Sequence, residues 1–316
     1  MMKWHEQMPK GKRWRFVAVV GPTASGKSFV GMELAKAFQG TIICCDSVQL
    51  YRGFDIGSAK PSAQDQARVP HLLFDQFAWD EVCDAAIYAR LARAAITDVV
   101  DAGRLPIVVG GTGLYLRALI GELWDDDVPS DEGLRQRLAI RQSADLYAEL
   151  RERDPRRAGQ LHENDRFRVI RALEINFLTG APVRDSAAST RPPPPRDHLL
   201  VFMNPPRDAL YANINDRVRS MLSGGLIDEV RGLLDAGVDP SCKVMGSIGY
   251  KEVFRMLSGH LPVADLERDI ATATRQYAKR QVTWFKKIAA DAVLSETSDV
   301  TELLSTFETL GFRGEE

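Results

Sequence analysis

Cysteine and histidine are scarce in this sequence, and neither residue type forms a pattern that binds metal. The four cysteines are too few and too widely spread for a disulfide framework, and the five histidines are scattered. No apolar run approaches the roughly 20 residues that a membrane helix needs. The apolar part of the N-terminal segment is also too short for a signal peptide. We therefore expect a cytoplasmic protein that does not cross a membrane.

The sequence also lacks a strong excess of charge of either sign. Its 316 residues carry a formal net charge of −2, with 45% apolar and 27% charged residues, which is ordinary for an enzyme. Net charge is a weak guide to nucleic-acid binding, because binding depends on where the cations lie. The length allows one large domain with an insertion, and a monomer is the simplest expectation.

The first part of the chain alternates between strand and helix patterns. Short apolar runs at residues 16–21, 41–46 and 105–112 predict buried strands. Residues 28–38 and 84–103 have the apolar period of helices between them. This alternation predicts an α/β fold, in which helices cover both faces of a parallel sheet and ligands bind at the carboxyl ends of the strands.

The pattern changes after about residue 122. Residues 123–195 are rich in arginine, helical in period and without strand signals, and they end in the stiff run "STRPPPPRD". Strand character returns at 198–206. We therefore predict a P-loop NTPase-like α/β core with C-terminal helices from residues 1–122 and 196–316, and an inserted all-helical domain from residues 123–195.

The stretch "GPTASGKS" matches the phosphate-binding pattern G-x-x-x-x-G-K-[ST]. Its glycines let backbone N–H groups turn toward anionic oxygens, and the following helix adds its positive N-terminus. Lys27 supplies a point charge, and Ser28 can hold a phosphate oxygen or a metal ion. The loop predicts a bound phosphate chain that is hydrolysed, transferred or expelled as diphosphate. The predicted phosphate-binding residues are Gly21, Pro22, Thr23, Ala24, Ser25, Gly26, Lys27 and Ser28.

A second candidate site follows the second predicted strand, in "CCDSVQLYRGFDIGSAKP". Asp46 lies at the end of that strand, where a carboxylate could be a metal ligand, a general base or a helix cap. Gln49 and Tyr51 follow within a few residues, and both are types that read or stack on adenine. The presence of these two residues near Asp46 favours a nucleobase site over a simple helix cap.

Together with four further segments, these motifs resemble the tRNA dimethylallyltransferase family. Members of this family attach an isopentenyl group to N6 of the adenosine next to the anticodon, at position 37. The matching segments run in the family's order over residues 21–286, and Ser58 stands where the family usually has threonine. They are "GPTASGKS", "DSVQLY", "DIGSAKP", "GGTGLYLRAL", "NDRFRVIRALE", "SIGYKE" and "RQYAKRQVTWFK".

The resemblance implies a role for each residue of the predicted active site. The P-loop would hold the diphosphate of dimethylallyl diphosphate, with catalytic help from Lys27 and from Thr112 at the neighbouring strand end. Arg217 occupies the position of a diphosphate-facing arginine, and Asp46 that of the general base acting on N6. The cofactor would be Mg²⁺, held mainly by phosphate oxygens and water, with Ser28 as its protein ligand.

The resemblance also implies an RNA-binding surface. Residues 275–287 contain five Lys or Arg and no acidic residue, which fits a helix face against RNA phosphates. The implied tRNA-binding residues are Asp46, Ser47, Val48, Gln49, Arg135, Phe167, Arg168, Arg171, Gly246, Gly249, Tyr250, Lys251, Lys279, Arg280, Trp284 and Lys286.

Three other functions remain as alternatives. An isopentenyltransferase that uses free AMP or ADP would share the chemistry, but it has no need of an arginine-rich insertion or a basic helix. A P-loop kinase of a nucleoside or small metabolite leaves "DSVQLY" and "SIGYKE" without a role. A non-catalytic RNA-binding module predicts that loss of Asp46 leaves function intact.

Overall fold

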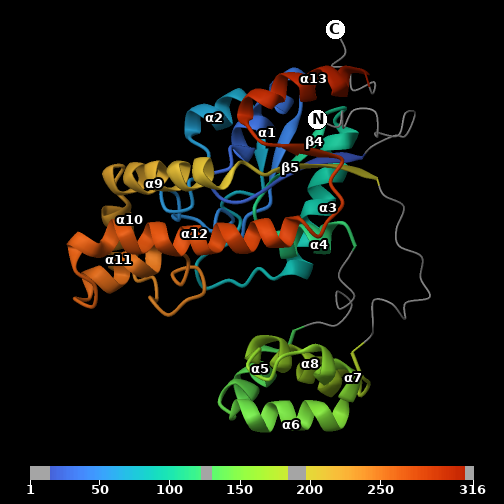
Figure 1. The fold of residues 1–316 in the computed structure, drawn as a ribbon, viewed down its shortest axis with the longest axis vertical. Helices are drawn as coiled ribbons and strands as arrows, with labels where there is room; N and C mark the ends of the chain where they lie inside the picture. Colours follow the sequence, from blue (N-terminus) through green and yellow to red (C-terminus); the bar gives the residue numbers. More distant parts are fainter. Residues whose placement is uncertain (1–14, 122–129, 184–196, 310–316) are drawn as a thin grey trace. The chain divides into compact units, whose positions relative to one another are not determined.

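The computed structural model describes residues 15–121, 130–183 and 197–309. The chain divides into two compact units, one made of residues 1–119 and 196–316 and the other of residues 120–195 (Figure 1). The proline-rich run and the predicted domain boundaries at 122/123 and 195/196 lie at or beyond the edges of the described residues.

A six-stranded parallel sheet forms the centre of the first unit, with the strand order β3-β2-β4-β1-β5-β6. The strands are β1 (Phe16–Val20), β2 (Thr41–Cys44), β3 (His71–Leu72), β4 (Pro106–Gly110), β5 (His198–Met203) and β6 (Ala292–Leu294). Every residue of β1, β2, β4 and β5 is buried, as their continuous apolar runs predicted. The sequence analysis missed β3 and β6, because two or three residues are too few to show a periodic pattern.

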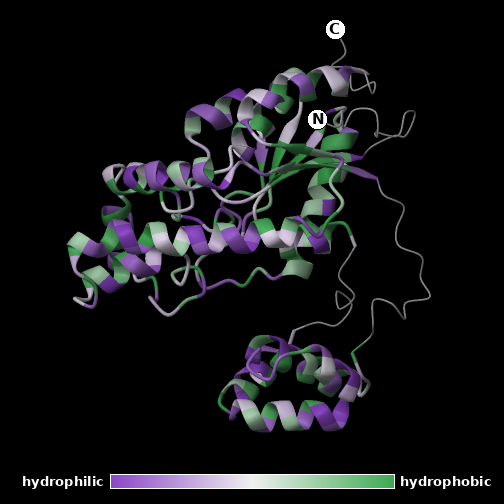
Figure 2. Ribbon diagram, viewed as in Figure 1, coloured by the Kyte–Doolittle hydropathy of each residue, from purple (hydrophilic) through white to green (hydrophobic). Residues whose placement is uncertain are grey.

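Helices cover both faces of this sheet, and the predicted α/β fold class is confirmed (Figure 1). Side chains of α1 and α13 pack with alternate residues of the strands in one apolar cluster. The central strands of the sheet are drawn mainly in green, the colour of hydrophobic residues, in Figure 2. The helices are α1 (Lys27–Ala37), α2 (Ala63–Arg68), α3 (Ala85–Asp101), α4 (Gly113–Leu119), α9 (Arg207–Ser223), α10 (Leu226–Asp235), α11 (Tyr250–Leu257), α12 (Leu266–Phe285) and α13 (Val300–Thr309). None of the helices among the described residues is long and apolar enough to span a membrane.

The second unit is helical throughout residues 130–183. Its helices are α5 (Glu132–Ala139), α6 (Ser143–Arg153), α7 (Pro155–Gln160) and α8 (Arg166–Thr179). Leu146, Leu150 and Leu173 lie at the centre of its own apolar core. Asp154 is buried and joins two parts of the unit, since it accepts hydrogen bonds from the N–H of Arg157 at the start of α7 and from the N–H of Val183.

Candidate active site

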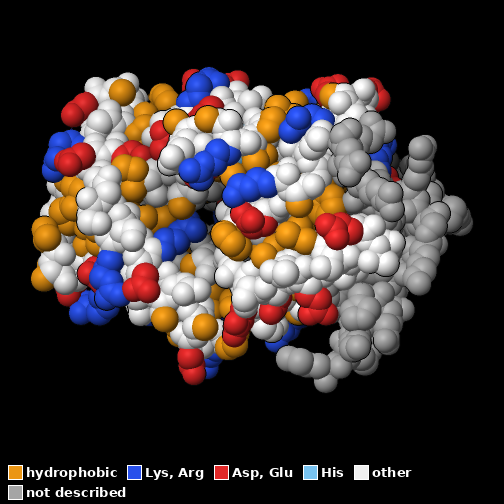
Figure 3. Space-filling model, turned by 90° about the horizontal axis from the view of Figure 1, so that it is seen from above, with side chains coloured by type: hydrophobic (Ala, Val, Ile, Leu, Met, Phe, Trp, Pro, Cys, Tyr) orange, Lys and Arg blue, Asp and Glu red, His pale blue; other side chains and the backbone are white. Residues whose placement is uncertain are grey.

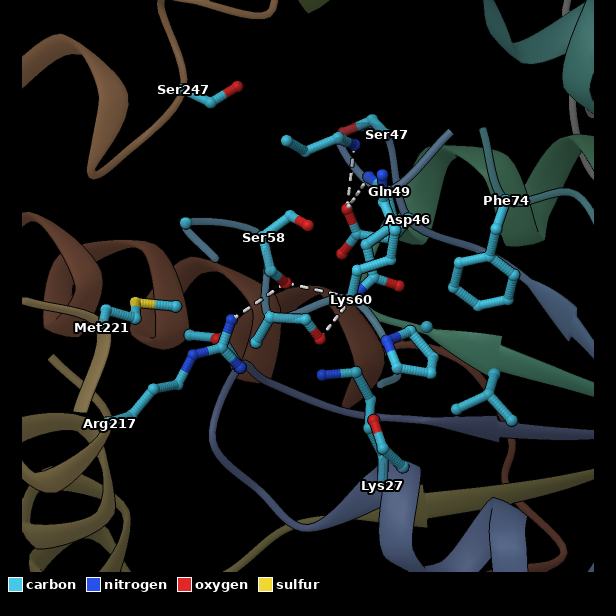
Figure 4. A pocket seen from close by; sticks show the side chains of 18 of the residues that line it. Lys27, Asp46, Ser47, Gln49, Ser58, Lys60, Phe74, Arg217, Met221 and Ser247 are labelled. Atoms are coloured by element: carbon cyan, nitrogen blue, oxygen red, sulfur yellow. Dashed lines mark hydrogen bonds between the residues drawn. The ribbon is translucent and has the colours of Figure 1, made fainter. Parts of the chain in front are cut away.

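A cavity of about 750 Å³ opens at the carboxyl ends of β1, β2 and β4, and every residue that lines it belongs to the first unit. Lys27, Asp46 and Arg217 reach it from the P-loop helix, the end of β2 and helix α9 (Figure 4). Figure 3 shows a hollow on one face of this unit with Lys and Arg side chains around it. The sheet thus brings the predicted phosphate site and the predicted nucleobase site into one space, as expected for strand ends of a parallel sheet.

The P-loop has the geometry of an anion cradle between β1 and α1. Gly26 has a φ of 87° and directly precedes α1, so the loop enters the helix through a left-handed residue. The Nζ of Lys27 lies 3.2 Å from the carbonyl of Pro22, which holds the ammonium over the loop. Burial, and then the nearby Arg217, lower the pKa of Lys27 from 10.5 to about 8. The site therefore favours binding of an anion, because the anion's negative charge replaces the water that the buried Lys27 ammonium has lost.

Asp46 caps the turn after β2 and also faces the two cations. Its Oδ1 accepts hydrogen bonds from the N–H of Val48 at 2.9 Å and of Gln49 at 3.4 Å. Its negative charge opposes the lowering of the pKa of both Lys27 and Arg217. Asp46 therefore does have the capping role that the sequence left open, and its side chain also forms part of the cavity wall.

Thr112 lies at the end of β4 and connects this strand end to that of β2. Its Oγ1 accepts a hydrogen bond from the N–H of Ser47 at 3.0 Å, and Thr112 is not among the residues that line the cavity. Gly110 beside it has no room for a side chain, because a Cβ atom would lie 1.9 Å from the carbonyl oxygen of Cys45. Thr112 thus fixes the position of Ser47, the residue that follows Asp46.

Arg217 and Gln49 meet at one backbone carbonyl. Nη2 of Arg217 donates to the carbonyl of Ser58 at 3.2 Å, and Nε2 of Gln49 donates to the same oxygen at 3.0 Å and to the carbonyl of Ala59. The segment "DIGSAKP" therefore provides the support against which the predicted diphosphate arginine and the predicted base-reading amide are oriented.

Two tyrosines do not face ligands as the sequence suggested. Tyr51 is buried, and its hydroxyl is hydrogen-bonded to the backbone of Glu81 and Cys83, so it cannot stack on an adenine. Tyr250 is fully buried and donates to Glu229, so its side chain cannot contact RNA. In both cases a residue type common in nucleobase sites serves instead to pack and hydrogen-bond the interior.

Gln281 is a site residue that the sequence analysis missed. It lies on α12, where its Oε1 accepts from the N–H of Thr23 in the P-loop at 2.9 Å and its Nε2 donates to the carbonyl of Gly111 at 2.8 Å. Its signal in the sequence is its spacing: it follows Tyr277 by four residues and precedes Trp284 by three, so it lies on their face of the helix rather than on the basic one.

A family model described as IPP transferase matches residues 49–288. The chain belongs to the IPP transferase family. It is 45% identical over 276 residues to tRNA dimethylallyltransferase 1 of Trichlorobacter lovleyi, which covers 86% of this chain and 90% of the relative. It is 43% identical to the tRNA dimethylallyltransferase of Geobacter sulfurreducens, with 88% of this chain and 90% of the relative covered. The predicted family resemblance is therefore confirmed.

Solved structures show the same fold. The tRNA isopentenylpyrophosphate transferase of Bacillus halodurans is 36% identical, with a TM-score of 0.69 and coverage of 93% of this chain and 96% of that one. A eukaryotic dimethylallyltransferase acting on tRNA is 29% identical, with a TM-score of 0.79 and coverage of 95% and 76%. The IPP transferase fold thus extends over both units of the chain.

Helix α12 of this IPP transferase presents two different faces. Lys279, Arg280 and Lys286 are exposed, and Arg280 also lines the cavity. Trp284 follows Arg280 by four residues, on a face that points away from Lys279 and Lys286, and it packs against Gly113 of α4, where a Cβ atom would lie 2.3 Å from the indole ring. The basic residues are therefore available to RNA, whereas Trp284 joins α12 to α4.

The predicted RNA-binding arginines of the second unit also divide into two groups. Arg135 and Arg171 form ion pairs with the fully buried Glu174, at 2.9 and 2.6 Å, and so compensate its buried negative charge. Phe167 is 77% exposed, and the side chain of Arg168 is 61% exposed. An exposed aromatic ring beside an exposed guanidinium is the combination that suits RNA.

The "SIGYKE" motif forms a loop at the edge of the cavity that leads into α11. Gly246 and Lys251 line the cavity and are exposed. Gly249 is buried with a φ of 95°, and its N–H donates to the carboxylate of Glu252, so it begins α11 as a backbone turn. Only part of this predicted RNA-binding segment is open to a ligand.

The site fits a magnesium ion that arrives with its diphosphate. Among the described residues, no group of three or more His, Cys, Asp or Glu side chains could hold a metal by itself. Ser28 in the first turn of α1, Thr23 of the P-loop and Asp46 are among the oxygen-bearing side chains that line the cavity. Mg²⁺ commonly uses one or two protein ligands and completes its shell with phosphate oxygens and water, so this small donor set suits it.

Proposed function

We propose that this member of the IPP transferase family transfers the dimethylallyl group of dimethylallyl diphosphate to N6 of adenosine 37 in tRNA and releases diphosphate. The observation that carries the proposal is the meeting of Lys27, Arg217 and Asp46 around one cavity. Two cations suit a diphosphate leaving group, and a carboxylate opposite them suits an amine that must lose a proton. We propose that the enzyme acts as a cytoplasmic monomer.

On the donor side, the P-loop would neutralise the charge that develops on the leaving diphosphate. The positive N-terminus of α1, Lys27 and Arg217 approach it from two elements. Each well-placed donor of this kind contributes about 10²–10³ in rate. Mg²⁺, with Ser28 as a ligand, would supply further charge neutralisation on the diphosphate oxygens.

On the acceptor side, Asp46 would act as general base. The N6 amine of adenine is a poor nucleophile because its lone pair is delocalised into the ring. As the N6–C1 bond forms and the C1–O bond breaks, one N6 proton passes to the Asp46 carboxylate and the electron pair leaves with diphosphate. General-base assistance of this type contributes about 10²–10⁴ in rate. Gln49 and Ser47, which line the cavity beside Asp46, would read the edge of the base.

For tRNA, we propose contacts from both units. The exposed Lys279, Arg280 and Lys286 of α12 suit backbone phosphates, and the exposed Phe167 and Arg168 suit an unpaired base and its phosphate. The target adenosine has to leave its stack to reach Asp46, because the cavity lies below the protein surface. A mononucleotide acceptor would need none of these exposed groups.

The test of the proposal is label transfer. Purified protein, Mg²⁺ and radiolabelled dimethylallyl diphosphate are mixed with unmodified tRNA, with AMP, or with ATP and nucleosides in place of the prenyl donor. Label in tRNA and not in AMP is the expected result. Label in AMP alone would overturn the acceptor. Consumption of ATP without prenyl transfer would identify a kinase instead.

A further inference from the structure

Glu229 on α10 has an unusual set of hydrogen-bond partners. Its carboxylate accepts from three successive backbone N–H groups, those of Asp55 at 3.2 Å, Ile56 at 2.7 Å and Gly57 at 3.2 Å. It also accepts from the hydroxyl of Tyr250 at 2.7 Å. One side chain thus joins α10, the "DIGSAKP" loop and the first residue of α11.

The packing around this carboxylate leaves the loop little freedom. The fully buried ring of Tyr250 lies against Phe54, with 5.0 Å between the ring centroids. A Cβ atom on Gly57 would lie 2.5 Å from the Tyr250 ring, so only glycine allows this approach. Burial, and then Glu229, raise the pKa of the Tyr250 phenol, so the hydroxyl remains a donor to the carboxylate.

The loop held in this way ends at the carbonyl oxygen that orients the active site. The Ser58 carbonyl accepts from Nη2 of Arg217 and from Nε2 of Gln49, while the Ser58 hydroxyl donates to the carbonyl of Phe54 at 2.6 Å. Ser58 directly follows the three N–H groups bound by Glu229. A movement of the loop therefore moves both the diphosphate arginine and the base-reading amide.

We propose that Glu229 is a positioning residue for prenyl transfer, which sets the place of Arg217 and Gln49 through the 55–58 loop and is itself oriented by Tyr250. Glu229 is not among the residues that line the cavity. The role gives a purpose to the hydrogen bonds by which Glu229 links "DIGSAKP" to Tyr250 of "SIGYKE", two segments that both contribute to the cavity wall. The proposal rests on the proposed function for its activity readout, whereas diphosphate binding tests it independently.

The variant that tests the proposal is Glu229→Gln. An amide keeps the size of the side chain, but its NH₂ group cannot accept a hydrogen bond, so part of the loop's N–H row loses its acceptor. Asp228→Asn is the matched control, since its side chain lies on the same helix, is 79% exposed and, among the described residues, pairs only with Arg231. Tyr250→Phe is the second variant, because it removes one hydrogen bond and keeps the ring.

The experiment is a double-mutant cycle between Glu229→Gln and Arg217→Ala. Two quantities are measured for each variant: the affinity for inorganic diphosphate in the presence of Mg²⁺, and kcat/KM for transfer to tRNA. Misplacement by about 1 Å lowers such rates by up to about 10²-fold. We expect Glu229→Gln to weaken both quantities, and Arg217→Ala to cost far less in the Glu229→Gln background than in the wild type. Asp228→Asn should match the wild type.

Additive losses in the cycle, or unchanged diphosphate binding in folded Glu229→Gln, would overturn the positioning role. If Glu229→Gln does not fold, the same cycle with Tyr250→Phe decides the matter by the same criterion. Failure of the wild type to label tRNA would contradict the proposed function instead, while the diphosphate cycle would still report on Glu229.

Discussion

Asp46 illustrates how one side chain can serve both structure and chemistry. Its Oδ1 accepts two backbone N–H bonds in the turn that carries Ser47 and Gln49, and the same carboxylate lines the cavity opposite Lys27. Replacement by alanine therefore removes a cap as well as a base, whereas asparagine keeps an oxygen for the cap. The two substitutions separate the roles.

We predict that Asp46→Asn lowers kcat for prenyl transfer by about 10²–10⁴-fold, because the amide cannot take the N6 proton. Its tRNA affinity should stay within a few-fold of the wild type, and its melting temperature should be close to that of the wild type. Asp46→Ala should lose the same activity and also stability. Single-turnover kinetics and filter binding check this, and near-normal turnover in Asp46→Asn would exclude the base role.

The lowered pKa of Lys27 predicts a pH dependence of ligand binding. In the free enzyme the ammonium is charged below a pKa of about 8 and neutral above it. We therefore expect affinity for inorganic diphosphate to fall as the pH rises through about 8, even though diphosphate itself gains negative charge over this range. Calorimetry from pH 6.5 to 9.5 measures this, and Lys27→Arg, which stays charged, should flatten the profile.

The lowered pKa of Lys27 also predicts how stability depends on pH: stability should increase with pH, whereas diphosphate affinity should decrease. Because the folded-state pKa of Lys27 lies below its ordinary value of 10.5, the unfolded chain binds more protons between the two values. The contribution of this group to the free energy of unfolding is therefore unfavourable below pH 8 and is relieved as the pH rises from about 8 toward 10.5. Denaturant titrations of the wild type and of Lys27→Met over this pH range measure the contribution of Lys27 to the free energy of unfolding.

At the scale of elements, α12 connects the basic residues that we propose bind RNA to the P-loop. Its inner face carries Gln281, which bonds to the P-loop and to the end of β4, and Trp284, which packs on α4. Its outer face carries Lys279 and Lys286. A helix that contacts the P-loop on one side is a rigid base for basic side chains on the other.

We predict that Lys279→Glu weakens tRNA binding and lowers the slope of log affinity against log salt concentration by about 1, because one phosphate contact is lost. Diphosphate binding should not change. Arg268→Glu is the control on the same helix, since that side chain is exposed and lies three turns away, near the helix start. An unchanged salt slope in Lys279→Glu would assign the basic face a structural role.

At the scale of the whole molecule, the two units differ in what they offer to a ligand. The cavity is lined by the first unit alone, and the second has its own core and its own buried ion pairs around Glu174. What the second unit offers to a ligand is its exposed surface, above all Phe167 and Arg168. Its expected contribution is therefore to RNA affinity and not to diphosphate binding.

We predict that the double variant Phe167→Ala, Arg168→Ala lowers tRNA affinity by about tenfold or more, since loss of one base–aromatic stack alone costs about 1–3 kcal/mol. Its affinity for inorganic diphosphate should equal that of the wild type. Arg151→Ala, at another exposed basic position of the same unit, is the control. A parallel loss of diphosphate affinity would show that the second unit acts on the cavity itself.

Local patterns in the chain were enough to predict the sheet, the P-loop and the family. The apolar runs of β1, β2 and β4 show a buried parallel sheet because strands covered on both faces have no polar alternation. The P-loop is readable because all its parts lie within eight neighbouring residues, from Gly21 to Ser28. Asp46 was also found in this way, since it directly follows a strand.

Contacts between distant segments could not be predicted by the same means. Tyr51 and Tyr250 have the residue type of nucleobase contacts, yet packing buries both. Glu229 lies in no motif, and Gln281 lies within "RQYAKRQVTWFK" without having been singled out there. The importance of both residues comes from backbone groups more than 170 positions away in the chain. The sequence pattern shows which face of an element is apolar. The hydrogen-bond partner of a buried polar group depends instead on how the elements pack, because most such partners lie on other elements, and only the tertiary structure decides that packing.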